Sequence, residues 1–121
     1  MRRHAVAALA ILALLGMPAL ASAHAFLNRA VPAVGSKIRK PPAQVRLHFT
    51  ERIEAGFSSL RVLDARGARV DKGDARGDPS DPAALLIDLK PLPRGTYKVI
   101  WRAVSVDTHV TEGDFTFEVA P

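Results

Sequence analysis

Three residues from two distant parts of the sequence have side chains that can bind one metal ion together. His24 follows Ala21-Ser22-Ala23, a small-x-small pattern that signal peptidase accepts, while Asp107 and His109 stand two positions apart near the end of the chain. Cleavage before His24 would give this residue a free α-amine beside its imidazole, and the two nitrogens can chelate one ion. The amine has a reference pKa of about 7.7–8.0, so it loses its proton readily near neutral pH.

The side chains of Asp107 and His109 would complete this set of donors. In an extended segment, residues two apart point to the same side, so we expect the carboxylate and the imidazole to converge. Together with His24 they offer three nitrogens and one oxygen, a set that suits copper(II). Each feature also has a plain alternative. A terminal histidine is often a frayed, solvated end, and Asp-x-His in a loop is often a turn aspartate beside an exposed histidine.

Residues 1–23 have the three-part organisation of a secretory signal peptide. Arg2 and Arg3 give a positive start, residues 5–15 are apolar, and Pro18 breaks the run before the cleavage pattern. A membrane anchor is the alternative, but the apolar run is shorter than the roughly 20 residues that span a bilayer. We therefore expect residues 1–23 to be removed, which leaves an exported domain of residues 24–121 without a membrane span.

The composition argues against several other kinds of chemistry. The chain of 121 residues contains no cysteine, so disulfides and thiolate metal sites are excluded. Its formal net charge of +5 includes Arg2 and Arg3 and falls to +3 without them. The remaining basic residues are interspersed and lack the basic stripe with stacking aromatics that nucleic-acid binding needs. No serine, cysteine or paired-carboxylate constellation supports catalysis, so we do not expect an enzyme.

Short segments of alternating hydrophobicity, separated by Pro, Gly and Asp, predict one all-β domain. Val45, Leu47 and Phe49 share one face, and so do Tyr97 and Trp101. The predicted strands are residues 25–28, 44–49, 57–63, 68–70, 85–89, 96–104 and 114–119, with a loop over residues 71–82. About seven strands at this spacing indicate a β-sandwich. The spacing leaves open whether the strands close into a barrel or pack as two sheets.

The sequence contains HAFLNRAVPAVGS (24–36), VRLHFTE (45–51), LPRGTYKVIWRAVSVDTH (92–109) and GDFTFEV (113–119). Together these segments resemble the CopC family of periplasmic copper-binding proteins. The resemblance covers nearly all of residues 24–121. It implies a small Greek-key β-barrel or sandwich, immunoglobulin-like or cupredoxin-like in shape. It also implies a copper(II) site formed by the amine and imidazole of His24 with Asp107 and His109. Glu51 matches a family glutamate close to that site, and we assign it the role of holding the amine.

Two residues near the predicted site depart from the pattern of this family. Thr108 stands where the family often has glycine, and Val110 stands where it often has proline. We expect Thr108 to be tolerated in a loop. We expect Val110 to change how rigidly His109 is held.

A third departure concerns copper(I). Some members carry a methionine-rich loop whose soft thioethers bind copper(I). Here the matching segment, residues 64–81, has aspartates and arginines, and the only methionines are Met1 and Met17 in the predicted leader. We therefore predict no copper(I) site. We interpret His48 as a polar residue on the outer face of its strand rather than a remnant of that second site.

The resemblance implies a periplasmic protein that sequesters or delivers copper, with a CopD-type inner-membrane copper transport protein as a partner. A copper-dependent oxidative enzyme is one alternative, because an N-terminal histidine also holds copper in polysaccharide-cleaving monooxygenases. The inward positions expected for Tyr97 and Trp101 leave such an enzyme no aromatic platform for a glycan. A metal-free, immunoglobulin-like structural module is the other alternative. It requires the three residues His24, Asp107 and His109 to occur together by coincidence.

Overall fold

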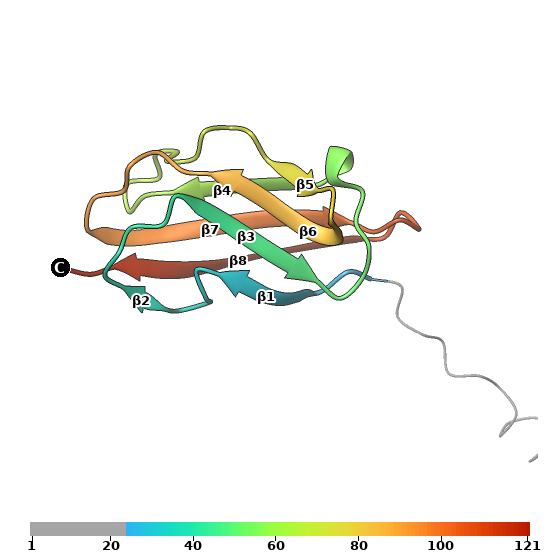
Figure 1. Cartoon of the computed structure of the whole chain (residues 1–121), viewed down its shortest axis with the longest axis horizontal. Coiled ribbons are helices and arrows are strands. Elements are labelled where there is room, and N and C mark those ends of the chain that lie inside the picture. Colours follow the sequence, from blue (N-terminus) through green and yellow to red (C-terminus); the bar gives the residue numbers. More distant parts are fainter. Residues whose placement is uncertain (1–23) are drawn as a thin grey trace, which may run out of the picture.

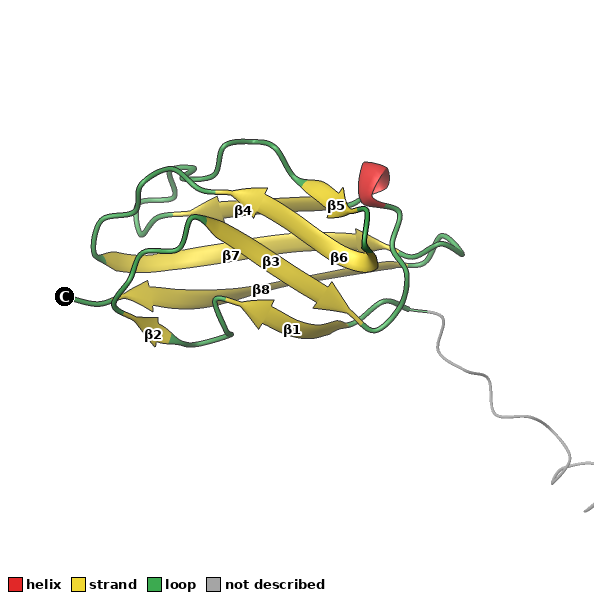
Figure 2. Ribbon diagram, viewed as in Figure 1, coloured by secondary structure: helices red, strands yellow, loops and turns green. Residues whose placement is uncertain are grey.

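The computed structural model describes residues 24–121; the predicted leader and its cleavage site, residues 1–23, lie outside the described residues. Within the described part, eight strands form two sheets, and one short 3-10 turn lies between the third and fourth strands (Figures 1 and 2). These elements are β1 (Leu27–Val31), β2 (Lys37–Ile38), β3 (Gln44–Phe49), η1 (Ala55–Phe57), β4 (Ser59–Leu63), β5 (Arg76–Asp78), β6 (Asp81–Asp88), β7 (Gly95–Val104) and β8 (Val110–Val119). No helix among residues 24–121 is long and apolar enough to cross a membrane.

The two four-stranded sheets have the strand orders β1-β3-β6-β5 and β2-β8-β7-β4. The chain passes from one sheet to the other at every connection except the β5–β6 and β7–β8 hairpins. All neighbouring strands are antiparallel except β2 and β8, which are parallel. The prediction of an all-β domain is confirmed. The two sheets remain separate, so the domain is a sandwich rather than a closed barrel.

Alternating side chains fill the space between the sheets, as the sequence pattern predicts. The edge of the Phe49 ring meets the Trp101 ring with 5.3 Å between centroids, and Tyr97 stacks on Phe117 at 5.5 Å. Tyr97 and Trp101 are both buried, which confirms their inward orientation. The Tyr97 hydroxyl also donates a hydrogen bond to the carbonyl of Pro93, which ties the start of β7 to the preceding turn.

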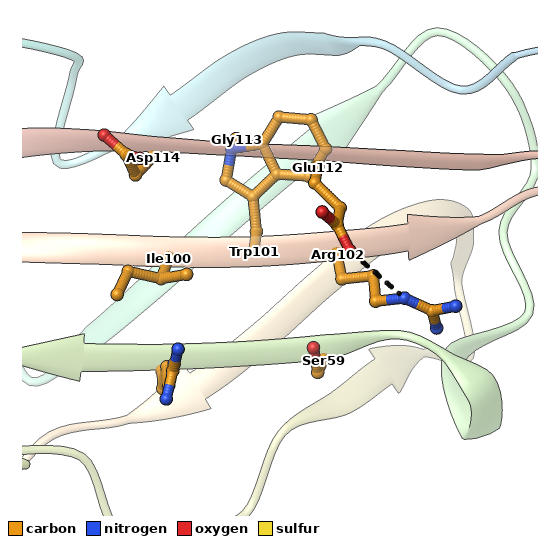
Figure 3. A pocket seen from close by; sticks show the side chains of 8 residues that line it. Ser59, Ile100, Trp101, Arg102, Glu112, Gly113 and Asp114 are labelled. Atoms are coloured by element: carbon orange, nitrogen blue, oxygen red, sulfur yellow. Dashed lines mark ion pairs between the residues drawn. The ribbon is translucent and has the colours of Figure 1, made fainter.

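The Trp101 indole lies directly against Gly113, its partner across the β7–β8 ladder (Figure 3). A Cβ atom at residue 113 would stand 2.5 Å from Cζ2 of Trp101. Only a glycine leaves room for the indole at this point of the core. The identity of Gly113 is therefore set by packing.

The prediction of a loop over residues 71–82 is wrong, because this segment contains β5 and the first residues of β6. Aspartate side chains bond to backbone groups here and hold the chain against the sheet. Asp74 Oδ1, for example, accepts the N–H of Asp88 at 2.9 Å. The predicted strand over residues 68–70 is also wrong, since it makes only an isolated bridge between Leu63 and Arg69. Strand β2, only two residues long, was missed.

Asp71 anchors the beginning of this aspartate-rich segment inside the protein. Its carboxylate is buried and accepts the backbone N–H groups of Val62 and Gly73, each at 2.9 Å. Arg69 donates two further hydrogen bonds, at 2.8 and 3.2 Å. Burial acts to raise the pKa of Asp71, but Arg69 and the two backbone donors outweigh it and leave the pKa below its ordinary value. The carboxylate is therefore ionised at neutral pH.

Candidate metal centre

The start of the described chain and the turn between β7 and β8 lie at the same end of the sandwich (Figure 1). The β7–β8 ladder runs without interruption from Gly95–Val119 to Val104–Val110, which places the turn of residues 105–109 beyond the sheet. Strand β1 enters at this end because Leu27 pairs with Phe49, the last residue of β3. The fold thus brings together segments that are about as distant in sequence as the domain allows.

Two threonines fix the segment that directly follows His24. The Thr111 hydroxyl of β8 donates to the carbonyl of Ala25 at 2.5 Å. Thr50 exchanges two bonds with Phe26, one to its carbonyl at 2.8 Å and one from its N–H at 3.0 Å. The Ala25 side chain is fully buried in the core. His24 therefore projects from a part of the backbone that both sheets hold in place.

The segment from Ser105 to His109 forms a tight turn between β7 and β8, so an extended backbone is not what brings Asp107 and His109 together. The N–H of Thr108 donates to the carbonyl of Ser105, and the N–H of Ser105 donates to the carbonyl of His109, both at 2.9 Å. Thr108 has a φ of 70°, in the left-handed region that favours glycine. This backbone reversal, rather than strand alternation, turns the side chains of Asp107 and His109 toward each other.

The structure brings His24, Asp107 and His109 into one cluster. The rings of His24 and His109 meet edge to face, with 4.8 Å between centroids. Nδ1 of His109 lies 3.3 Å from Oδ2 of Asp107, and both side chains are about half exposed. The ring of Phe26 lies 5.9 Å from that of His24. The cluster consequently lies at the surface, where a dissolved ion can reach it.

Asp107 is prepared to act as an anionic ligand at neutral pH. The hydroxyl of Ser105 donates a hydrogen bond to Oδ1 at 2.5 Å, and this bond is the main reason that the pKa of Asp107 lies below its ordinary value. The neighbouring His109 lowers the pKa further, while partial desolvation opposes the shift. Since metals bind the deprotonated carboxylate, this shift keeps the group available over a wider pH range.

The cluster fits a copper ion by its chemistry and by the spacing of its rings, although its donor atoms do not yet converge. Within residues 24–121, no three His, Asp or Glu side chains are already arranged to hold a metal ion. An imidazole nitrogen lies about 2 Å from a bound ion, so the ring centres of two ligands are separated by roughly 4.5–6 Å. The 4.8 Å between His24 and His109 falls in this range. The exposed rings would have to rotate and point their nitrogens at a common position before an ion could bind.

Glu51 lies at the same end of the sandwich, directly after Thr50. Because Thr50 pairs with Phe26, the backbone of Glu51 follows close to the first described residues. The Glu51 side chain is exposed. This position is compatible with an outer role beside the cluster, and it leaves the predicted bond to the amine as a hypothesis.

His48 lies away from the cluster, on the outer face of β3. Its Nδ1 is 3.0 Å from Oδ2 of Asp81, and its Nε2 accepts a hydrogen bond from Nε of Arg46 at 3.0 Å. Arg46 also donates to Asp78 at 2.7 Å. The backbone N–H of Ser80 and this guanidinium lower the pKa of Asp78 to about 2. His48 is thus one member of an ion-pair network that joins β3 to the β5–β6 hairpin.

A shallow depression over β4, β7 and β8 contains none of the candidate ligands (Figure 3). Its charged lining is mixed in sign and consists of Arg61, Arg102, Glu112 and Asp114. Arg102 and Glu112 form an ion pair at 3.4 Å. Because this surface is open and largely self-neutralised, it offers no focused charge for a ligand. The His-Asp-His cluster is the site with the more specific chemistry.

Sequence reasoning missed the residues that support this cluster. Thr50 and Thr111 act through the backbone of residues 25 and 26, and no sequence signal reveals a bond between residues 86 positions apart. Ser105 did leave a signal, because a serine two positions before an aspartate commonly bonds to its own turn.

The fold and the cluster together define a class: small β-sandwich proteins that gather imidazole and carboxylate donors at one end. A family model described as the CopC domain matches residues 27–120, so the chain belongs to the CopC domain family. A crystal structure of CopC from Methylosinus trichosporium OB3b is 36% identical, with a TM-score of 0.76 over 81% of this chain and 95% of that one. PcoC from Escherichia coli, described as a methionine-rich copper resistance protein, is 34% identical, with a TM-score of 0.70 over 81% of this chain and all of its own.

One relative is much longer than this chain. The copper transport protein CutJ of Bacillus subtilis (strain 168) is 32% identical over 110 residues, which are 90% of this chain and 20% of CutJ. The shared part is therefore a domain-sized fraction of that protein. Members of the CopC family are copper resistance and copper-binding proteins rather than enzymes, which argues against the oxidative-enzyme alternative. Copper is the metal that the family membership supports.

Proposed function

We propose that this chain is an exported copper(II)-binding protein of the periplasm that sequesters or delivers copper. In this proposal residues 1–23 are a signal peptide, and the mature domain begins at His24. The proposal joins two independent supports. One is the membership in a family of copper resistance proteins, and the other is a cluster of side chains suited to copper(II).

The observation that carries the proposal is the meeting of His24 with Asp107 and His109. These residues are more than 80 positions apart, yet the two rings are in contact and the carboxylate lies beside the second ring. The bond from Thr111 to Ala25 and the pairing of Thr50 with Phe26 hold the backbone that carries His24. These contacts keep His24 close to the turn that carries Asp107 and His109.

Four donors make copper(II) the preferred ion. After cleavage, His24 supplies its amine and imidazole, His109 supplies an imidazole and Asp107 supplies a carboxylate oxygen. Nitrogen and oxygen donors of this kind suit the tetragonal geometry of copper(II), which also binds most tightly among divalent first-row ions. Glu51 is the proposed outer partner that holds the amine, since such groups orient metal ligands.

We infer that the domain has no copper(I) site. Residues 24–121 contain no methionine or cysteine, the soft ligands that copper(I) prefers. Both ring nitrogens of His48 already have partners in Asp81 and Arg46. Reduction of bound copper should therefore release it. Titration with copper(I) against a competing chelator should show no tight binding, and a tight complex would contradict this inference.

The proposed partners are the copper ion and a CopD-type inner-membrane copper transport protein that exchanges copper with the domain. The family resemblance supports such a partner, and the relative CutJ is named a copper transport protein. Co-expression of the two proteins, followed by measurement of copper uptake, would test whether the domain acts beside such a transporter. Equal uptake with wild-type domain and with a His24→Ala variant would speak against delivery through this site.

Native mass spectrometry of the protein recovered from the periplasm tests the core of the proposal. We expect the mass of a chain that begins at His24. When copper(II) is added, this mass should increase by that of one copper ion per chain. The His24→Ala variant should lose this copper. The matched control is His48→Ala, which removes a histidine outside the cluster and should keep it. A protein that binds copper equally well in all three forms would refute the proposed site.

A further inference from the structure

Ser105 contacts both candidate ligands that come from the β7–β8 turn. It is one of two buried polar or charged residues among residues 24–121, with 1% of its surface exposed. It follows β7 directly and forms an isolated bridge with Ile53, so its backbone is held against the segment between β3 and η1. A serine in such a position keeps its hydroxyl in one orientation, because burial and the fixed backbone leave little freedom.

The Ser105 hydroxyl divides its contacts between Asp107 and His109. It donates to Oδ1 of Asp107 at 2.5 Å and accepts the backbone N–H of His109 at 3.2 Å. The carbonyl of His109 lies 3.2 Å from the same hydroxyl. Since a hydroxyl has a single hydrogen, the shorter bond to the charged carboxylate takes it. A lone pair of the hydroxyl oxygen accepts the N–H of His109.

These contacts determine which carboxylate oxygen faces the cluster. Because Oδ1 of Asp107 is bound to Ser105, the plane of the carboxylate is fixed, and Oδ2 points toward the ring of His109 at 3.3 Å. A carboxylate on an exposed turn would otherwise sample several rotamers. Because the side chain is already held in one orientation, it loses less conformational entropy when the ion binds.

We propose that Ser105 is a positioning residue for the copper site: it fixes the carboxylate of Asp107 so that Oδ2 is the atom that binds the ion. This inference rests on the proposed function above. It goes further by assigning the ligand atom and the residue that orients it. Ser105 itself does not touch the ion.

A double-mutant cycle on the mature protein tests the proposal, with copper(II) as the probe and a competing chelator to set the free concentration. The variants are Ser105→Ala, Asp107→Ala and the double variant. Loss of a group that orients a metal ligand typically weakens binding about 10- to 100-fold, so Ser105→Ala should weaken copper(II) binding at least about tenfold. If Ser105 acts through Asp107, adding Ser105→Ala to Asp107→Ala should change the affinity less than about twofold.

The electron paramagnetic resonance spectrum of bound copper(II) supplies a readout that a purely structural role would not move. Ser105→Ala should alter the copper hyperfine splitting toward that of Asp107→Ala, since both lose the fixed oxygen. Near-ultraviolet circular dichroism of Trp101 shows whether each variant is folded. Should Ser105→Ala fail to fold, Ser105→Thr and Ser105→Val form a matched pair of equal shape, of which only threonine keeps the hydroxyl. The Ser105→Thr variant should then bind copper(II) at least about tenfold more tightly than the Ser105→Val variant.

The outcomes separate this inference from the proposed function. A folded Ser105→Ala variant with wild-type affinity and spectrum, beside an Asp107→Ala variant that binds weakly, overturns the role of Ser105 and leaves the site intact. Equal losses from Ser105→Ala with and without Asp107 also overturn it, because the serine would then act elsewhere. If neither Asp107→Ala nor His24→Ala affects binding, the proposed site itself fails, and the inference fails with it.

Discussion

Replacing Thr108 with glycine should raise the thermal stability of the domain. Thr108 is the only non-glycine residue among residues 24–121 with a positive φ, at 70°. The Cβ of an L-residue crowds the following carbonyl in this conformation, and a branched Cβ makes the crowding worse. The turn between β7 and β8 requires the conformation, so the strain is present as long as the turn is formed. Glycine adopts the same backbone without this penalty.

The expected gain can be worked out from three contributions. Relief of left-handed strain at a β-branched residue contributes about 2 kcal/mol. The greater freedom of glycine in the unfolded chain costs about 0.7 kcal/mol. The hydrogen bond from the Thr108 hydroxyl to the carbonyl of Asp107 is exposed, so its loss costs about 0.5 kcal/mol. The net stabilisation is about 0.8 kcal/mol, which in a domain of this size raises Tm by roughly 3–6 °C.

Thermal unfolding followed by circular dichroism measures this change. Thr108→Ala should give a smaller gain, because alanine removes the branch but keeps Cβ. The matched control is Ala65→Gly in the exposed turn after β4, where φ is not positive. It adds the same freedom to the unfolded chain without relieving strain, so Tm should fall by a few degrees. A Thr108→Gly variant that loses as much stability as Ala65→Gly would refute the strain argument.

Two further perturbations test the packing and the charges of the fold. Gly113→Ala places a Cβ 2.5 Å from Trp101 and should lower the stability of the fold by about 1–3 kcal/mol. The control, Gly56→Ala, adds a Cβ in open space. An equal loss of Tm in both variants would contradict the packing account. The pH dependence of Tm should reflect Asp71 and Asp78, whose pKa values lie below the ordinary value, to about 2 for Asp78. Depressed folded-state pKa values give stability that is fully present above the unfolded pKa of about 3.9 and is lost as the pH falls through the folded values. Tm should therefore be flat from about pH 7 to 5 and should fall between about pH 4 and 2. The fall should be less steep in the Asp71→Asn variant. An equally steep fall in this variant would argue against a contribution of Asp71 to the pH dependence.

Much of the fold could be predicted because strand alternation is a local property of the sequence. Residues 44–49 coincide with β3, and the inward faces of the predicted strands carry the core. The wrong predictions lie in segments where side-chain hydrogen bonds, rather than a hydrophobic pattern, hold the chain against the sheet. Asp71 and Asp74 bond to backbone N–H groups of neighbouring strands, so an aspartate-rich segment that resembles a loop pairs with the sheet. The pairing of β2 with β8 involves two residues and leaves no pattern to find.

The candidate site was predicted in its residues but not in its geometry. The cleavage pattern before His24 and the spacing of Asp107 and His109 are visible in the sequence, and the resemblance to the CopC family joined them. The turn that brings Asp107 close to His109 depends on the left-handed backbone of Thr108. The glycine that the family often has at this position is consistent with that conformation, but the threonine itself does not predict it. The link from Thr111 to Ala25 is a tertiary contact. Such contacts can be found only once the sheets are assembled.

The most direct test of the account compares copper(II) affinity before and after the terminal amine of His24 is converted to an amide. Two forms of the domain are titrated against the same chelator, one beginning at His24 and one with a single alanine ahead of it. Residues 24–121 are the same in both forms. Because a primary ligand and its chelate ring are lost, we expect the extended form to bind more than about a hundredfold more weakly, beyond the effect of an outer group. Equal affinities would contradict the claim that proteolysis creates the copper site.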